Sequence, residues 1–140
     1  MSDSFKVAHR VEFRDTDAAG IMHFSTFVTY MEESEHAFLR SLGLSVLHCE
    51  VDGMSISWPR VSVNCDFSQP LKFEDEFEVY VSVDRLGTKS LTYGFRFVSQ
   101  GRECARGAIT AVCCRMDESG MESIEIPQSL RERLTPFVGD

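Results

Sequence analysis

The sequence has 140 residues, of which 43% are hydrophobic and 26% charged, and its formal net charge is −8. This length and balance predict a single globular domain over residues 1–140. The negative charge argues against nucleic acid as a partner, because a polyanion would be repelled. No stretch resembles a signal peptide or approaches the roughly 18 apolar residues of a spanning helix, so no membrane insertion is expected. Five cysteines without a CxxC pair favour a reducing compartment, and we expect a cytoplasmic location.

The first two expected elements are a strand and a helix. Apolar and polar residues alternate from Phe5 to Phe13, which is typical of a half-buried strand. The apolar period then becomes helical from Phe24 to Leu42, with charged residues on the other side. Gly43 is a suitable helix stop. A helix of 18 residues would be about 27 Å long.

Strand periodicity returns in the second half of the chain. Strands are predicted over residues 60–67, 77–83 and 91–97, followed by a last strand within 104–116 whose small residues suggest a covered central position. Pro59 is expected at an edge, a bulge or a strand start. Pro127 is expected near the first turn of a short final helix. One helix against an antiparallel sheet of about five strands is an α+β fold, in which the sheet would wrap around the helix.

The stretch FRDTDAAGIMHF, residues 13–24, joins the first strand to the helix, and its two acids, glycine and histidine have three possible explanations. A calcium loop is one explanation, since Asp15, Asp17 and Gly20 match three EF-hand positions. However, the last ligand position is Thr26, where a bidentate glutamate is needed. No metal site is therefore expected. A second explanation is a plain turn whose acids only cap the helix.

The third explanation is an acyl-transfer site. The first N–H groups of a helix are unsatisfied and carry partial positive charge, so they would polarise a carbonyl oxygen docked there. A carboxylate nearby, Asp17, would attack that carbonyl or deprotonate a water. Gly20 would let the backbone approach the ligand closely. This arrangement needs no Ser-His-Asp triad.

The sequence Asp-Thr-Asp-Ala-Ala-Gly-Ile-Met at residues 15–22, followed by an aromatic-rich helix with an acid at Glu32, resembles the hotdog-fold acyl-CoA thioesterases. The nearest branch is the 4-hydroxybenzoyl-CoA thioesterase-like family, which includes the thioesterases associated with the Tol-Pal system. The stretches PRVSVNCDF, PLKFED, ARGAITAV and IEIP fit the same family, so the resemblance covers nearly the whole chain.

This resemblance implies a hotdog fold, a homodimer or homotetramer, and active sites between subunits. It implies that Asp17 is the catalytic carboxylate, either as nucleophile or as general base, and that the backbone N–H of Phe24 binds the thioester oxygen. Many relatives have a histidine where this chain has Phe24. His23 stands one place earlier, and it either points into the pocket as an accessory group or only packs and caps. Asp15 is interpreted as structural.

The expected substrate is an acyl- or aryl-CoA thioester, hydrolysed to the free acid and CoA without a further cofactor. Because CoA carries phosphates, basic residues are expected at the rim of the cleft, with Lys89 first and Arg60 second; ordinary surface cations are the alternative for both. A non-hydrolytic acyl-CoA-binding or scaffold member of the fold is the alternative to the enzyme.

Overall fold

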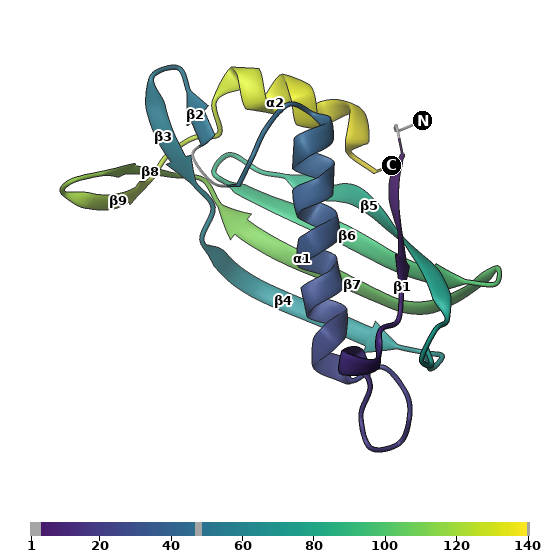
Figure 1. Ribbon diagram of the computed structural model, residues 1–140. Coiled ribbons are helices and arrows are strands. Elements are labelled where there is room, and N and C mark those ends of the chain that lie inside the picture. The colour runs from purple at the N-terminus through teal and green to yellow at the C-terminus, as the bar shows by residue number, and fades with distance from the viewer. Residues whose placement is uncertain (1–3, 47–48, 140) are drawn as a thin grey trace.

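The computed structural model describes residues 4–46 and 49–139. It is an α+β structure in which helix α1 crosses one face of a curved antiparallel sheet (Figure 1). The elements are β1 Phe5–Arg10, η1 Phe13–Asp15, α1 Phe24–Ser41, β2 Cys49–Val51, β3 Met54–Ser57, β4 Arg60–Phe67, β5 Glu76–Leu86, β6 Ser90–Ser99, β7 Arg102–Val112, β8 Cys114–Asp117, β9 Gly120–Ser123, α2 Gln128–Leu134 and η2 Thr135–Phe137.

The main sheet has five strands in the order β1-β5-β6-β7-β4, all paired antiparallel. Strands β1 and β4 form its two edges, and β7 lies in the interior as its small residues predicted. Pro59 directly precedes the edge strand β4, whose register shifts between Arg60 and Ser62. The predicted α+β class, the strand number and the edge position of Pro59 are therefore confirmed.

Helix α1 has the 18 residues that the spacing predicted, and it ends before Gly43, which adopts φ +76°. Its apolar stripe faces the sheet, and Phe27, Met31 and Phe38 are buried there. Strand β7 makes room for this face with small residues. A Cβ on Gly107 would lie 2.6 Å from the sulfur of Met31, so only glycine allows the helix to approach the sheet this closely.

Two predicted strands differ from the structure. Strand β1 ends at Arg10 rather than Phe13, because η1 begins there and Glu12 and Asp15 cap it through reciprocal side-chain to backbone contacts. The side chain of Phe13 is consequently exposed. The predicted last strand is divided at Cys113 into β7 and β8. Strand β8 leaves the main sheet and joins a second sheet of order β2-β3-β8-β9, which the sequence did not predict.

The C-terminal helix α2 follows Pro127, as predicted, and its Leu130 and Leu134 are buried. It lies across the end of the sheet next to the C-terminal end of α1 (Figure 1). The loop of residues 16–23 lies at the opposite end of α1, so the two ends of the helix have different surroundings.

Candidate active site

Asp15 anchors the loop that leads into α1. Its buried carboxylate accepts hydrogen bonds from the backbone N–H of Glu12 and from the hydroxyl of Tyr30 on the helix. Its backbone oxygen accepts from the N–H of His23 at 2.7 Å. Burial, followed by the neighbouring Asp15, raises the pKa of the Tyr30 hydroxyl, so Tyr30 stays protonated as the donor. These contacts agree with the interpretation of Asp15 as a structural residue.

Asp17 is held by the loop that it begins. Its Oδ1 accepts from the N–H of Ala19 at 2.8 Å and from that of Ile21 at 3.4 Å. The N–H of Asp17 in turn donates to the carbonyl of Ile21, which closes the loop. Gly20 turns the chain with φ +83°, a conformation that costs residues with a Cβ about 1–2 kcal/mol. Among the described residues, no donor contacts Oδ2 of Asp17, which leaves this oxygen open to a ligand.

The start of α1 has one capped and one open amide. His23 is the N-cap residue, and its Nδ1 accepts from the N–H of Ser25 at 3.2 Å. Its ring also stacks on that of Phe24, with centroids 4.5 Å apart. Of the two alternatives for His23, this structure therefore shows capping and packing. The N–H of Phe24 has no acceptor among residues 4–46 and 49–139, which leaves it open to a ligand.

A pocket of about 470 Å³ joins the loop, the helix start and the end of β4. Asp17 and Phe24 both line it, and most of its other walls are apolar. The remaining lining residues are Ile21, Met22, Phe27, Phe67, Ser68, Gln69 and Pro70. The site thus combines one carboxylate, one open amide at a helix N-terminus and an apolar chamber, which suits polarisation of a carbonyl next to a nucleophile or base.

Sequence reasoning missed the wall formed by residues 67–70. The only available signal was the apolar Phe67 at the end of an edge strand, followed by Pro70. Strand pairing explains its position, because the loop forms one isolated bridge and a backbone hydrogen bond with the connection after β4. The N–H of Met22 donates to the carbonyl of Leu71 at 2.6 Å, and Ile21 is bridged to Lys72.

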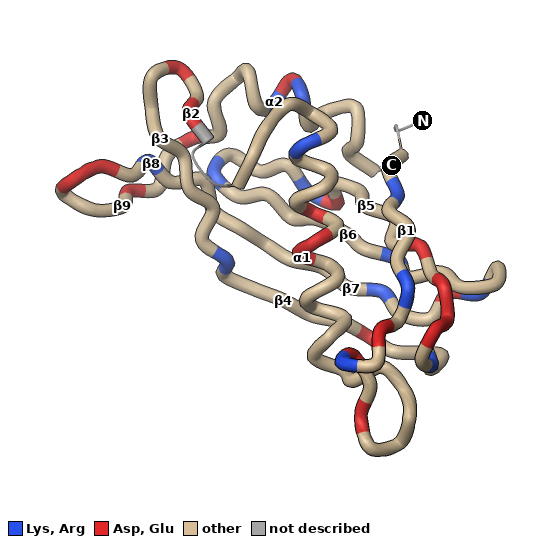
Figure 2. Tube along the Cα trace, in the orientation of Figure 1, with Lys and Arg blue, Asp and Glu red and all other residues tan. Residues whose placement is uncertain are grey.

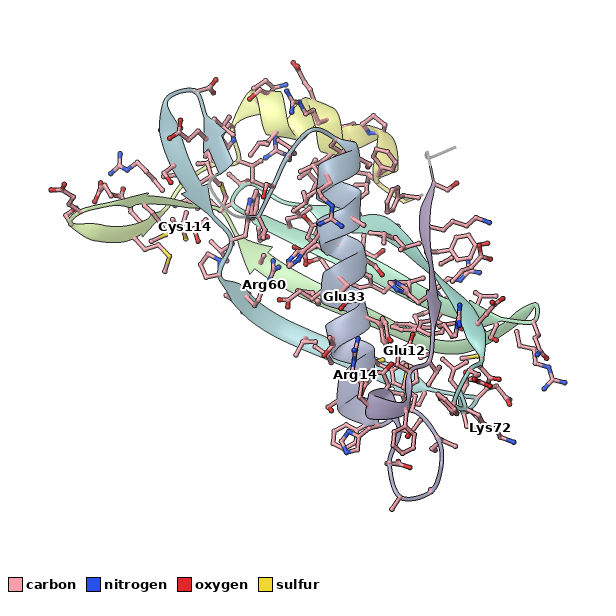
Figure 3. The ribbon with its side chains drawn as sticks, in the orientation of Figure 1. Glu12, Arg14, Glu33, Arg60, Lys72 and Cys114 are labelled. Carbon is pink, nitrogen blue, oxygen red and sulfur yellow. The ribbon has the colours of Figure 1, made fainter. Side chains whose placement is uncertain are left out.

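Arg60 is committed to an ion pair. Its Nη2 lies 2.7 Å from Oε2 of Glu35, a residue of α1 that is only 1% exposed. Figure 3 shows Arg60 at the start of β4, beside the middle of α1. Burial raises the pKa of Glu35 to about 7, although the neighbouring Arg60 opposes this rise. Binding of CoA phosphates by Arg60 stays a prediction.

Lys89 is not brought together with Asp17 within one chain. It lies in the turn between β5 and β6, and its carbonyl accepts from the N–H of Cys113. The neighbouring carbonyls of Gly87 and Thr88 accept from Arg131 of α2, so this turn is at the other end of α1 (Figure 1). Lysines and arginines are spread over separate elements (Figure 2). Arg14 and Lys72 lie at the end of the molecule where α1 begins and where the loop of residues 16–23 is found (Figure 3).

Across residues 4–46 and 49–139, no group of three or more histidine, cysteine or acidic side chains has the arrangement of a metal site. None of the helices in those residues has the length and hydropathy needed to span a membrane. Cys104, Cys113 and Cys114 are buried, where a reduced cysteine packs as a small apolar residue.

Comparison with known proteins indicates the class of protein to which this chain belongs. A gentisyl-coenzyme A thioesterase superposes with a TM-score of 0.78 at 33% identity, covering 91% of this chain and 99% of that one. The dynemicin thioesterase superposes with a TM-score of 0.86 at 26% identity over 99% of both chains. The 1,4-dihydroxy-2-naphthoyl-CoA hydrolase of Synechococcus sp. (strain WH7803) is 28% identical over 117 residues, which are 79% of this chain and 76% of the relative.

The fold and these similarities define a thioester hydrolase with the hotdog fold. The chain belongs to the thioesterase-like superfamily, whose profile matches residues 11–134.

Proposed function

We propose that the protein hydrolyses acyl- or aryl-CoA thioesters to the free acid and CoA, with Asp17 as the catalytic carboxylate. The observation that carries this proposal is the shared pocket of Asp17 and the helix start at Phe24. The thioester oxygen would accept from the N–H of Phe24, where the helix also contributes partial positive charge. Oδ1 of Asp17 is held by loop amides, so Oδ2 would face the carbonyl carbon.

Two chemical routes fit this arrangement. In the first, the Asp17 carboxylate attacks the carbonyl carbon, the C–S bond breaks, CoA leaves as a thiolate and water hydrolyses the mixed anhydride. In the second, Asp17 removes a proton from a water that attacks the carbonyl, and this proton then passes to the leaving sulfur. Incorporation of ¹⁸O into the Asp17 carboxyl during turnover in labelled water would identify the anhydride route, because the general-base route leaves that carboxyl unlabelled.

The proposed assembly is a homodimer that pairs its β4 strands, and a tetramer would arise from two such dimers. Strand β4 is a sheet edge, and its Val61 and Val63 are 62% and 52% exposed. An edge strand with apolar side chains is a template for pairing with another strand. The pocket of Asp17 includes Phe67 at the end of this strand, so a second copy would complete the open side of the pocket.

The substrate proposal draws on the named relatives, whose thioesters carry gentisyl and 1,4-dihydroxy-2-naphthoyl groups. A mostly apolar pocket of about 470 Å³ is compatible with an acyl group of that size. The alternative is a member of the fold that binds acyl-CoA without hydrolysing it.

A panel of aliphatic and aromatic acyl-CoA thioesters tests the proposal, with the released thiol measured by a chromogenic reagent. We expect turnover by the wild-type protein and a loss of about 100-fold or more in kcat for Asp17→Asn, since general-base and nucleophile contributions are of that size. Glu118→Gln, which removes an exposed acid in the turn between β8 and β9, far from β4 in the sequence and in the other sheet, is the control. Binding of CoA thioesters without turnover would favour the alternative, and full activity of Asp17→Asn would remove Asp17 from the mechanism.

A further inference from the structure

The ring of Tyr30 on α1 packs against two other rings. It lies edge-on to Phe77 of β5, with centroids 5.1 Å apart and an interplanar angle of 90°, and its centroid is 4.8 Å from that of His9 on β1. His9 is held in turn by the hydroxyl of Ser34, which lies 3.0 Å from its Nε2. Tyr30 is only 6% exposed, so close packing restricts the direction in which its hydroxyl points.

That hydroxyl donates to a carboxylate at the base of the loop of residues 16–23. The acceptor is Oδ2 of Asp15, which also accepts from the N–H of Glu12. The hydroxyl of Tyr30 lies 3.2 Å from the carbonyl oxygen of Arg10 as well, at the end of β1. The side chain of Asp15 is thus attached to the helix at the point where the first strand gives way to the loop.

The backbone of Asp15 is attached to the same helix at its start. The carbonyl oxygen of Asp15 accepts from the N–H of His23 at 2.7 Å and from the hydroxyl of Thr26 at 3.4 Å. Tyr30 follows Phe24 by less than two helical turns. Because the hydrogen-bonded helix keeps these positions fixed to one another, the contacts of Asp15 also fix it relative to the open N–H of Phe24.

Asp17 is connected closely to this attachment. Only Thr16 separates it from Asp15, and Thr16 is bridged to Met22 across the loop. A shift of Asp15 relative to the helix would therefore move Asp17 relative to the helix start. Neither Tyr30 nor Asp15 is among the described residues that line the pocket of about 470 Å³, so their influence on a thioester bound there would be indirect.

We propose that Tyr30 is a positioning residue for thioester hydrolysis, because its hydrogen bond to Asp15 sets the distance between the carboxylate of Asp17 and the N–H of Phe24. This inference rests on the proposed function, since it names what orients the two groups of that site. Both groups must meet the same carbonyl, and a misplacement of about 1 Å can cost about 100-fold in rate. The effect of Tyr30 is therefore expected in kcat rather than in KM.

Tyr30→Phe is the first test, because it removes the hydroxyl and keeps the ring that packs on His9 and Phe77. For the best acyl-CoA thioester of the panel, kcat should fall by about tenfold or more, while KM changes by less than about threefold because the pocket walls remain. An unchanged kcat would overturn the inference.

Phe38→Leu is the matched control, since it removes buried ring atoms from the other half of the same helix. It should lower the unfolding midpoint and keep kcat within about threefold of wild type, because it leaves the Tyr30–Asp15 hydrogen bond in place. Equal losses of kcat in Phe38→Leu and Tyr30→Phe would also overturn the inference, because activity would then follow stability alone.

Substitutions of Asp15 separate the hydrogen bond from the negative charge. Asp15→Ala removes the acceptor and should lower kcat as Tyr30→Phe does, whereas Asp15→Asn keeps an oxygen that can accept and should recover most of the loss. Tyr30→Phe/Asp15→Ala should lose no more kcat than Asp15→Ala, since both changes remove the same bond. Additive losses, or an Asp15→Asn protein as impaired as Asp15→Ala, would contradict positioning through this bond.

Hydrogen exchange separates this inference from the proposed function, because it needs no turnover. In Tyr30→Phe, the amides of residues 16–23 should exchange at least about tenfold faster than in wild type, while those of β6 keep their rates. If this holds and the wild-type protein turns over no thioester, hydrolysis is wrong and the attachment of the loop by Tyr30 stands. If the wild-type protein hydrolyses thioesters and Tyr30→Phe changes neither the exchange nor kcat, the role of Tyr30 is wrong and hydrolysis stands.

Discussion

At the scale of single residues, the candidate site depends on how one carboxylate is oriented without a charged partner. The loop amides of Ala19 and Ile21 hold Oδ1 of Asp17, and the left-handed Gly20 brings those amides round to it. The neighbouring Asp15 is used instead to attach the loop to the helix. Asp15 and Asp17 thus differ in their surroundings. The Tyr30 hydroxyl on α1 donates to the carboxylate of Asp15, whereas within the described residues the carboxylate of Asp17 accepts only from amides of the loop.

Glu35 should make the stability of the protein depend on pH. Its pKa in the folded state is about 7, against 4.5 in a free side chain, with burial as the main cause. The folded state therefore binds more protons between those values, and this contribution to stability falls as pH rises from about 4.5 to about 7. In wild type, this contribution to the free energy of unfolding should fall by about 1–3 kcal/mol between pH 4.5 and 7, and the fall should be absent in Glu35→Gln. Urea unfolding at several pH values measures it.

Other titratable groups also make stability depend on pH, and some act in the opposite direction. The effect of Glu35 is therefore read from the difference between the wild-type and Glu35→Gln curves, because the other groups are the same in both proteins. Burial lowers the pKa of His9 and of His36 below 6.5, so their neutral folded forms favour stability as pH rises. Both histidines remain in the variant. Glu118→Gln, in an exposed turn, is the control and should follow the wild-type curve. If the Glu35→Gln curve also parallels wild type from pH 4.5 to 7, the buried carboxyl does not titrate as expected.

The site was only partly visible in the sequence. The spacing of Asp17, Gly20 and Phe24 is local, so the motif was sufficient to place them at one helix start. The partner of Arg60 is 25 residues away on α1, and only the packing of the helix on β4 brings Glu35 to it. The capping of the Ser25 amide by His23 depends on the side-chain rotamer, which the sequence does not determine.

At the scale of elements, long segments with one strong period were predicted well. Helix α1 and strands β4, β5 and β6 match their expected ranges to within a few residues, because each keeps one apolar period over its whole length. In α1, β5 and β6 the apolar face is buried, whereas on the edge strand β4 it is largely exposed. The second sheet was missed because its strands have only three or four residues, too few for a period to be read. The end of β1 was misjudged because capping by Asp15 competes with the alternation of apolar residues.

The contact between α1 and β7 should be sensitive to a single methyl group. An added Cβ on Gly107 would lie 2.6 Å from the sulfur of Met31 and 2.6 Å from the carbonyl oxygen of Asn64. Since the backbone oxygen cannot move freely, Gly107→Ala should destabilise the protein by about 1–3 kcal/mol through overpacking. Gly139→Ala is the matched control, because nothing lies within 4 Å of its added Cβ. Equal unfolding midpoints for the two variants would contradict this view of the helix–sheet contact.

At the scale of the whole molecule, the two ends of α1 differ in how completely the chain covers them. The C-terminal end is covered by α2, whose Arg131 binds the turn between β5 and β6. At the other end, Phe24 and Phe67 are largely exposed, and the pocket opens beside the uncovered edge β4. The chain thus closes one end of its core by itself and leaves the end with the candidate site open beside an unpaired sheet edge.

A charged residue on the face of β4 that carries Val63 and Phe67 should therefore prevent formation of the proposed dimer and reduce hydrolysis in the same variant. Val63 is half exposed in one chain and lies on the same face of β4 as Cys65 and Phe67, so it would be covered in the proposed dimer. Val63→Asp places two carboxylates in the paired interface, and their desolvation opposes association. We expect a folded monomer by light scattering, with native circular dichroism and hydrolysis reduced by at least about tenfold, because an open pocket admits water and loses the second wall.

Met121→Asp, an exposed apolar position on β9 in the other sheet, should keep the assembly and the activity of wild type. A Val63→Asp protein that remains a dimer would place the interface elsewhere, and a fully active monomer would show that one chain contains the complete site.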